Sequence, residues 1–289
     1  MKEIVVISGK GGTGKTSLTA SFAELAGENV VVADCDVDAA DMHLLMEPDF
    51  AKSEDFYSGY IAKINQDKCK QCGVCVSACQ FDAFQRKNGK YTIDPIACEG
   101  CGFCTSRCPM NAIEMQDAYS GKLYVSKTKN GNPMVHARLG IGADNSGKLV
   151  TQVKNEAKEI AINKNIDFIV VDGSPGIGCP VVSSLAGADF VVLVTEPSVS
   201  GFHDLKRVYE LLKSFRLTAG CIINKSDLNP EITNEIKSFL KEENIIHLAD
   251  LPYDEKFTEA MTNGKTIVEF DNGELQKIIK DTWKKISKN

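Results

Sequence analysis

Eight cysteines in the middle of the chain have a spacing that suits iron–sulfur chemistry. They form two C-x2-C-x2-C-x3-C runs within residues 69–108. Three thiolates in one short loop can hold one face of a cubane [4Fe–4S] cluster, and the fourth corner needs a thiolate from elsewhere in the chain. The spacing therefore predicts two [4Fe–4S] clusters. The first run is Cys69, Cys72, Cys75 and Cys79, and the second is Cys98, Cys101, Cys104 and Cys108.

This cysteine segment resembles the bacterial two-cluster ferredoxins, in which the fourth cysteine of each run binds the cluster of the other run. One departure is Gln80, which follows Cys79 where Pro is common, whereas Pro109 follows Cys108. The number of ligands is unaffected by this difference. The resemblance implies one ligand set of Cys69, Cys72, Cys75 and Cys108, and another of Cys98, Cys101, Cys104 and Cys79.

Disulfides and zinc are the other common uses of closely spaced cysteines. Disulfides need an oxidising compartment, and the N-terminal residues MKEIVVISGK lack the features of a signal peptide. Zinc fits C-x2-C pairs, but it does not explain a third and a fourth cysteine at fixed spacing in both runs. Zinc therefore stays the less favoured alternative.

A glycine-rich loop near the N-terminus has the residues of a phosphate-binding site. A β-branched run, residues 3–8, leads into G-x4-G-K-T, and a helix-prone stretch, residues 17–26, follows. In this setting backbone N–H groups surround phosphates, and the helix N-terminus adds its positive dipole end. Lys15 is then expected to reach the β- and γ-phosphates, and Thr16 to bind Mg²⁺. The predicted nucleotide-binding residues are Gly9, Lys10, Gly11, Gly12, Thr13, Gly14, Lys15, Thr16 and Ser17.

An additional lysine in this loop indicates which group of P-loop proteins the chain resembles. K-G-G-T-G-K-T, with Lys10 ahead of Lys15, resembles the deviant Walker A loop of the MinD/ParA/Mrp group of P-loop ATPases. The resemblance implies ATP as the nucleotide and a homodimer that forms on ATP binding. In such a dimer Lys10 reaches the nucleotide of the partner subunit, so Lys10 and Lys15 are both expected catalytic residues.

Acidic residues follow two further apolar runs. Asp36 comes soon after residues 30–33, and Asp172 directly follows residues 166–171. Ligands bind at the carboxyl ends of strands in open α/β sheets, and an Asp after an apolar strand supports Mg²⁺ in P-loop enzymes. The resemblance implies that Asp36 orients the attacking water and that Asp172 is the Walker B aspartate. The glycine-rich residues 173–178 then form a loop that responds to the γ-phosphate.

Two residues are expected near the base. Asn224 and Pro252 follow apolar runs at positions where the MinD/ParA group contacts or flanks adenine. Residues 224–227 also fit the N-K-x-D guanine-reading motif of GTPases, which stays an alternative.

Three cysteines lie outside the two runs. Cys35 and Cys221 belong to apolar segments and are expected to be buried. Cys179 lies seven residues after Asp172, where the nitrogenase iron protein has a cluster ligand, but a thiol packed in a loop is the simpler interpretation.

The amino-acid composition indicates which partners and which compartment to expect for the protein. The chain has 289 residues, of which 43% are hydrophobic, and a net charge of −6. An acidic chain gives no reason to expect nucleic acid, because phosphates attract clustered Lys and Arg. No apolar run approaches the ~20 residues that span a bilayer, so we expect a cytoplasmic protein. The basic amphipathic residues 275–286 predict a helix packed on the core, with membrane binding as the alternative.

The repeated strand–helix pattern predicts an α/β fold, namely a mostly parallel, doubly wound P-loop NTPase sheet with an inserted α+β ferredoxin-like domain. The expected domains are residues 1–64 with 118–289, and residues 65–117. The two resemblances together imply an ATPase whose dimerisation controls electron transfer or metal-cofactor assembly on an unidentified partner protein. The alternative is a MinD/ParA-like positioning or scaffold ATPase in which the clusters are only structural.

Overall fold

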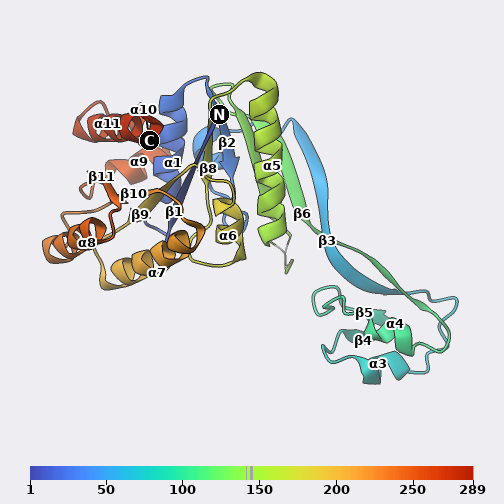
Figure 1. The fold of residues 1–289 in the computed structure, drawn as a ribbon. Coiled ribbons are helices and arrows are strands. Elements are labelled where there is room, and N and C mark those ends of the chain that lie inside the picture. The colour runs from blue at the N-terminus through green and yellow to red at the C-terminus, as the bar shows by residue number, and fades with distance from the viewer. Residues whose placement is uncertain (141, 144–145, 289) are drawn as a thin grey trace. The chain divides into compact units, whose positions relative to one another are not determined.

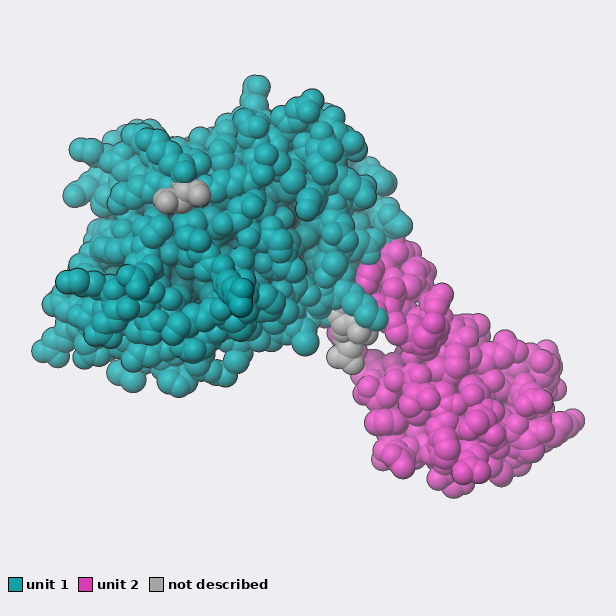
Figure 2. Space-filling view, viewed as in Figure 1, with its two compact units in different colours: residues 1–54, 123–138, 146–289 teal, residues 55–122, 139–145 magenta. Residues whose placement is uncertain are grey.

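The chain forms two compact units in a computed structural model that describes residues 1–140, 142–143 and 146–288 (Figure 2). Unit 1 comprises Met1–Glu54, Leu123–Arg138 and Ser146–Asn289, and unit 2 comprises Asp55–Lys122 and Leu139–Asn145. The boundaries at Glu54 and Lys122 fall inside two long strands, β3 (Lys52–Ile64) and β6 (Ile113–Lys127). The division into domains at residues 64/65 and 117/118 stays a prediction.

A mostly parallel sheet forms the framework of unit 1. Within the described residues its strand order is β11-β10-β9-β1-β8-β2-β7-β6-β3. Strand β1 pairs in parallel with β8 and β9, β2 with β8 and β7, and β10 with β9 and β11. The predicted α/β P-loop sheet is therefore confirmed. The strands are β1 (Lys2–Ser8), β2 (Val30–Asp34), β7 (Pro133–Leu139), β8 (Phe168–Asp172), β9 (Phe190–Thr195), β10 (Ala219–Ile223) and β11 (Ile246–Asp250).

Helices cover both faces of this sheet (Figure 1). On one face α1 contacts β1, β2 and β8, and α10 and α11 pack against α1. On the other face α5 lies along β2 and β8, while α6 and α7 contact β1. Successive residues of β1 point to opposite faces, so Ile4 and Val6 join the core with Leu18 and Phe22 of α1. The helices of unit 1 are α1 (Lys15–Ala26), α2 (His43–Met46), α5 (Ser146–Lys164), α6 (Cys179–Leu185), α7 (Val199–Phe215), α8 (Pro230–Glu242), α9 (Lys256–Thr262), α10 (Ile267–Phe270) and α11 (Glu274–Lys288).

The C-terminal helix α11 packs its apolar stripe on the core of unit 1. Ile279 and Ile286 are almost fully buried, and the ring of Trp283 stacks on Phe22 at a centroid distance of 5.9 Å. The predicted packing on the core is thus confirmed. No helix in the described part of the chain is long and apolar enough to cross a membrane.

Unit 2 contains two short helices and a small hairpin. The helices α3 (Val74–Ala78) and α4 (Phe103–Arg107) follow Gly73 and Gly102, whose φ angles are 78° and 72°. Such positive φ angles favour glycine. Strands β4 (Phe84–Lys87) and β5 (Lys90–Ile93) pair antiparallel. Few side chains of this segment are shielded from water: among residues 65–117, all of which the structure describes, the buried ones are Cys75, Ala83, Ala112 and Ile113.

Candidate functional site: a P-loop in unit 1 and two cysteine-lined cavities in unit 2

The P-loop lies where three parallel strands end. Residues 9–14 connect β1 to α1, and β8 and β2 are the next two strands on one side of β1. Because parallel strands end at the same edge of a sheet, β8 and β2 bring their acidic residues to the P-loop. In the ladder Asp172 is in register with Val6 of β1 and with Asp34 of β2.

Asp172 accepts hydrogen bonds from three side chains of the loop and of α1. Lys15 Nζ lies 2.8 Å from Asp172 Oδ1, and Thr16 Oγ1 donates to Asp172 Oδ2 at 2.7 Å. Thr19 Oγ1 donates to Asp172 Oδ1 at 2.9 Å. Lys15 Nζ is also 3.4 Å from Asp36 Oδ2. The structure therefore brings together the four residues predicted for the phosphates, the metal and the attacking water, namely Lys15, Thr16, Asp36 and Asp172.

The charges at this site depend strongly on one another. Burial raises the pKa of Asp34 well above its usual value, and the neighbouring charge of Asp172 raises it further. Burial also raises the pKa of Asp36, although Lys15 opposes this effect. For Lys15 burial lowers the pKa, but the carboxylates of Asp172, Asp36 and Asp34 outweigh burial and the pKa is raised. Lys15 therefore stays charged and offsets part of the negative charge of the carboxylates around it.

A cavity at the P-loop has room and polar groups for a ligand. It is lined by residues 11–17, by Asp36 and by Pro175, and its empty volume is about 860 Å³ including the part open to solvent. Thr13 Oγ1 lies in this lining and is buried without a hydrogen-bond partner among residues 1–140, 142–143 and 146–288. Buried polar atoms are nearly always paired. A phosphate, which brings acceptor oxygens, fits this hydroxyl, the ammonium group of Lys15 and the backbone N–H groups of the loop.

Lys10 is held by residues that follow β9. Its Nζ lies 2.8 Å from Glu196 Oε1 and donates to the hydroxyls of Ser198 and Ser200, each at 3.0 Å. The adjacent Gly9 packs on α7, where an added Cβ would lie 2.5 Å from the Cβ of Asp204. Gly9 is thus needed for the close approach of the loop to α7.

Asn224, at the end of β10, packs directly on the P-loop. Its Nδ2 donates to the carbonyl of Thr13 at 2.8 Å, and its Oδ1 accepts from the backbone N–H of Lys225 at 3.0 Å. An added Cβ at Gly14, where φ is 90°, would lie 2.6 Å from Asn224 Nδ2. Pro252 follows β11 and is exposed. The expected contacts of Asn224 and Pro252 with a base stay predictions.

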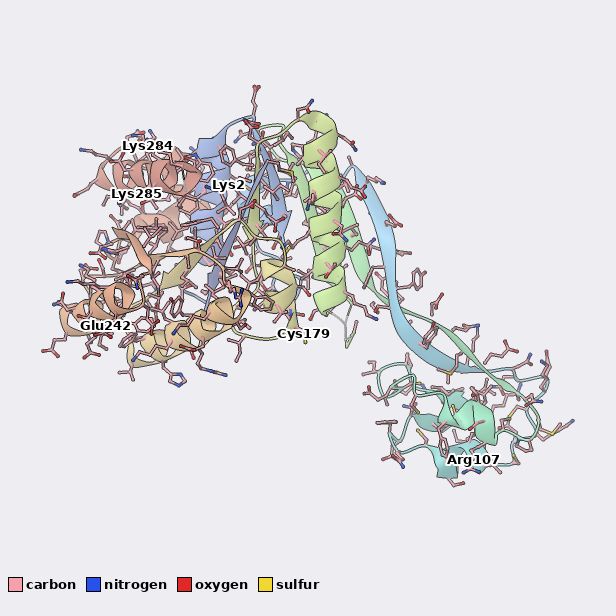
Figure 3. The ribbon with its side chains drawn as sticks, in the orientation of Figure 1. Lys2, Arg107, Cys179, Glu242, Lys284 and Lys285 are labelled. Carbon is pink, nitrogen blue, oxygen red and sulfur yellow. The ribbon has the colours of Figure 1, made fainter. Side chains whose placement is uncertain are left out.

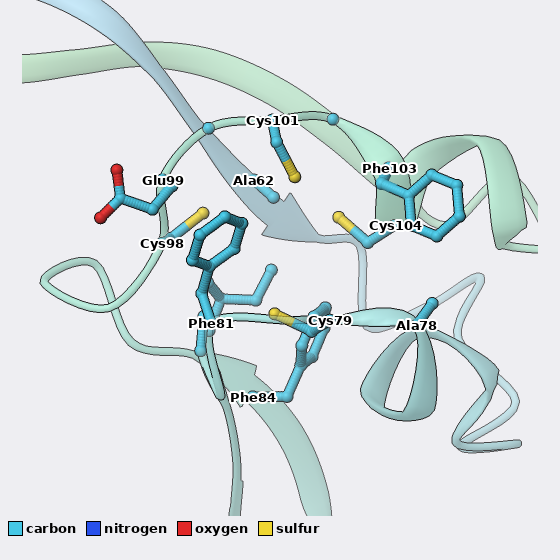
Figure 4. A pocket seen from close by; sticks show the side chains of 14 residues that line it. Ala62, Ala78, Cys79, Phe81, Phe84, Cys98, Glu99, Cys101, Phe103 and Cys104 are labelled. Carbon is cyan, nitrogen blue, oxygen red and sulfur yellow. The ribbon is translucent and has the colours of Figure 1, made fainter.

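The eight cysteines of the two runs line two separate cavities in unit 2. The volumes are similar, about 350 and 360 Å³ including the parts open to solvent. In Figure 4 the labelled cysteines of the second cavity point toward its centre. In each cavity the fourth cysteine of one run lies with the first three of the other. The first cavity has Cys69, Cys72, Cys75 and Cys108, and the second has Cys79, Cys98, Cys101 and Cys104.

The cavities are otherwise mainly apolar. Ile64 and Ile113 contribute to the first, and Phe84 and Ile93 to the second. Burial raises the pKa of the thiols of Cys75 and Cys104. Within the described residues, no group of three or more His, Cys, Asp or Glu side chains could hold a metal ion.

Comparison with known proteins identifies the family. The model of the CobQ/CobB/MinD/ParA nucleotide binding domain matches residues 4–267. The chain belongs to this family. An uncharacterized protein of Methanocaldococcus jannaschii is 34% identical over 286 residues, which cover 98% of this chain and 96% of that protein. The sporulation initiation inhibitor protein Soj of Bacillus subtilis is 22% identical over 125 residues, 38% of this chain and 47% of Soj.

Solved structures of MinD proteins share the fold of this CobQ/CobB/MinD/ParA family member. A chain of the MinC:MinD cell division protein complex of Aquifex aeolicus has a TM-score of 0.60 at 18% identity, covering 100% of this chain and 96% of that one. The cell division ATPase MinD of Pyrococcus furiosus has a TM-score of 0.56 at 19% identity, covering 99% and 98%. At this level of identity the likeness shows the fold alone.

Sequence reasoning missed several residues that the structure places at the P-loop. Thr19 could have been found, because it lies one helical turn after Lys15 and so faces the same side of α1. Glu196 belongs to no motif that we recognised, and Lys225 belongs only to the alternative N-K-x-D motif. Both residues reach the loop through the order of the strands. Cys35 and Cys221 are fully buried as expected, whereas Cys179 is exposed at the start of α6 (Figure 3).

Proposed function

We propose that this protein is an ATPase that pairs with a second copy of itself when it binds ATP and Mg²⁺. We further propose that unit 2 holds two [4Fe–4S] clusters through which the ATPase controls electron transfer to a partner protein, or metal-cofactor assembly on it. The observation that carries the proposal is the placement of the eight cysteines in two cavities with the fourth cysteine of each run exchanged.

The P-loop residues have the chemistry that ATP hydrolysis needs. Lys15 and the loop N–H groups would hold the β- and γ-phosphates, and Thr16 and Asp172 would hold Mg²⁺, which neutralises phosphate charge when bound. Asp36 would orient the attacking water. Since Lys15 and Thr16 are both bonded to Asp172 here, binding of the nucleotide requires these two side chains to exchange Asp172 for phosphate and metal.

The cysteine cavities fit cubane clusters better than a single ion. Each thiolate of a cubane binds a different iron, so its four ligands need not meet at one point as the ligands of one zinc ion do. Residues 65–117, the proposed ferredoxin domain, bury little apolar surface of their own. Small domains of this kind usually need metal or disulfides to be stable, and all eleven cysteines are free thiols. Bound clusters would supply both a core and one-electron chemistry.

A second candidate function is a positioning or scaffold ATPase with clusters that are only structural. The likeness to MinD cell division proteins and to Soj favours it. The two functions differ in whether nucleotide and clusters affect each other. Coupling of ~1–3 kcal/mol is usual between linked sites, and 1.4 kcal/mol corresponds to about 59 mV for one electron. Redox titration with and without a non-hydrolysable ATP analogue should then shift a cluster midpoint potential by tens of millivolts if electron transfer is the function.

The first experiment is anaerobic purification with iron counting, paramagnetic resonance and ATPase assays. About eight irons per chain are expected for two cubanes, and Cys179→Ser, which alters a thiol outside the two cavities, should not change that number. Lys15→Ala is expected to abolish nucleotide binding, whereas Lys10→Ala should keep binding and lose the dimer. Iron-free protein after anaerobic purification and reconstitution would remove the cluster proposal, and full ATPase activity of a strict monomer would remove the dimer.

A further inference from the structure

Glu196, the residue after β9, links the P-loop to two lysines. Its Oε1 lies 2.8 Å from Lys10 Nζ, and its Oε2 lies 2.8 Å from Lys225 Nζ. Lys225 Nζ also donates to the carbonyl of Gly12 at 3.3 Å. Both lysines therefore connect Glu196 to the loop, since Lys10 belongs to it and Lys225 bonds to it. The side chain of Glu196 is 19% exposed, so both ion pairs are partly shielded from water.

Lys10 is fully occupied within its own chain. An ammonium group has three N–H donors, and three acceptors surround that of Lys10, namely Glu196 Oε1, Ser198 Oγ and Ser200 Oγ. No donor is left for a phosphate. If Lys10 is to reach the nucleotide of a partner subunit, it must first give up these three contacts.

Lys225 makes this release less costly. A carboxylate that loses its only partner in a partly buried place carries a desolvation penalty. Glu196 keeps Lys225 when Lys10 leaves, because the two lysines bind different oxygens of the carboxylate. The pair Glu196–Lys225 can thus stay in place on the P-loop while Lys10 moves.

We propose that Glu196 is a positioning residue that retains Lys10 in its own subunit until nucleotide draws two subunits together. Glu196 thereby sets the nucleotide concentration at which the dimer forms. This inference rests on the proposed ATP-dependent homodimer and adds the residue that opposes it. Variants that weaken the contacts of Lys10 should form the dimer at lower nucleotide concentrations. If Glu196 had a purely structural role, the same variants would need higher nucleotide concentrations.

The test is a titration of dimer formation with Mg²⁺ and a non-hydrolysable ATP analogue, followed by analytical ultracentrifugation. Glu196→Gln keeps the shape of the side chain and removes its charge. We expect its midpoint to fall to about one fifth of the wild-type nucleotide concentration, a factor that corresponds to ~1 kcal/mol, the upper end for a partly exposed ion pair. The matched control is Glu210→Gln on α7, whose carboxylate is 68% exposed and pairs with Lys213. The control should leave the midpoint unchanged.

Two further variants separate retention of Lys10 from general damage. Ser200→Ala removes one acceptor of Lys10 and keeps Ser198, whose hydroxyl caps α7 by accepting from the N–H of Gly201. Ser200→Ala should also lower the midpoint, by a smaller factor than Glu196→Gln does. If Glu196→Gln fails to fold, the midpoint of Ser200→Ala tests the retention of Lys10 instead. In a Lys10→Ala background, Glu196→Gln should have no effect on any residual association, as expected for two residues that act through one contact.

The outcomes distinguish the two proposals. An unchanged or higher midpoint for folded Glu196→Gln, or for Ser200→Ala if Glu196→Gln does not fold, overturns the role of Glu196 while leaving the ATP-dependent dimer intact. Wild-type protein that stays monomeric at saturating nucleotide overturns the dimer, and the retention of Lys10 falls with it. A lower midpoint for both variants, with the control unchanged, supports the proposal.

Discussion

Replacing Lys15 by Met is expected to destabilise the nucleotide-free protein as well as to abolish ATP binding. Lys15 Nζ lies 2.8 Å from Asp172 and 3.4 Å from Asp36, and the side chains of Lys15 and Asp172 are 5% and 1% exposed. Removing the cation leaves these carboxylates and Asp34 without a counter-charge. Loss of one partner of a buried ion pair typically costs ~3–5 kcal/mol.

The pH dependence of that loss follows from the same geometry. Without Lys15, the carboxylates of Asp34, Asp36 and Asp172 repel one another, and the pKa values of Asp34 and Asp36, which burial already raises in the folded protein, rise further above their unfolded values of about 4. At pH values between the unfolded and the folded pKa, the folded protein binds more protons than the unfolded protein. The free energy of unfolding therefore increases as the pH falls. The loss of unfolding free energy in Lys15→Met relative to wild type should therefore be larger at about pH 8 than at about pH 5.

The assay is urea unfolding of unit 1 without nucleotide, followed by the fluorescence of Trp283, the single tryptophan, which is packed on Phe22. Lys10→Ala is the matched control, because the Lys10–Glu196 pair is partly exposed and should cost ~1 kcal/mol or less. A Lys15→Met variant as stable as Lys10→Ala at both pH values, or a deficit that grows in acid, would refute the reasoning.

Three other predictions concern unit 2 and His136, a buried residue of β7. Anaerobic Cys108→Ser should lose the cluster held with Cys69, Cys72 and Cys75 and keep the paramagnetic signal of the other cluster, and the reverse pattern would contradict the exchanged sets. Removing iron with a chelator should make residues 65–117 sensitive to proteolysis, because that segment buries few of its own side chains. The urea midpoint reported by Trp283 fluorescence in unit 1 should not change. Equal resistance of residues 65–117 to proteolysis with and without iron would contradict this prediction. Burial lowers the pKa of His136 to about 4, so protonation of this side chain in the unfolded state should cost wild type about 3 kcal/mol of stability between about pH 6.5 and 4. His136→Gln lacks this contribution, so the difference in stability between the two pH values, measured by urea titration, should be about 3 kcal/mol less unfavourable than in wild type.

The parts of the fold that sequence analysis predicted are those where local pattern and chemistry agree. The apolar run of β1, the glycine loop and the helix-prone residues of α1 lie next to one another in the chain, so their order alone identifies a P-loop. The burial of Cys35 and Cys221 likewise follows from the apolar residues next to them in the chain. In each case the information is contained within a few residues of the feature.

Sequence analysis missed features that depend on residues far apart in the chain, or on strands that lack alternating polar and apolar residues. Strand β3 is exposed along most of its length, so its residues show no alternation of polar and apolar types that would mark a strand. The contact of Lys10 with Glu196 joins residues far apart in the sequence, which meet because β9 lies beside β1. No spacing rule predicts such a contact without the strand order.

The position of β1 in the sheet also fixes the order in which a growing chain can complete its parts. β1 is the first strand to leave the ribosome, yet both of its neighbours, β8 and β9, come after residue 167. Residues 55–122, by contrast, have been fully synthesised before either neighbour exists. Domains generally fold as units during synthesis. Unit 2 can therefore fold, and take up the proposed clusters, while the P-loop strand is still unpaired. The cysteine-lined part of the chain is then complete before the P-loop can function.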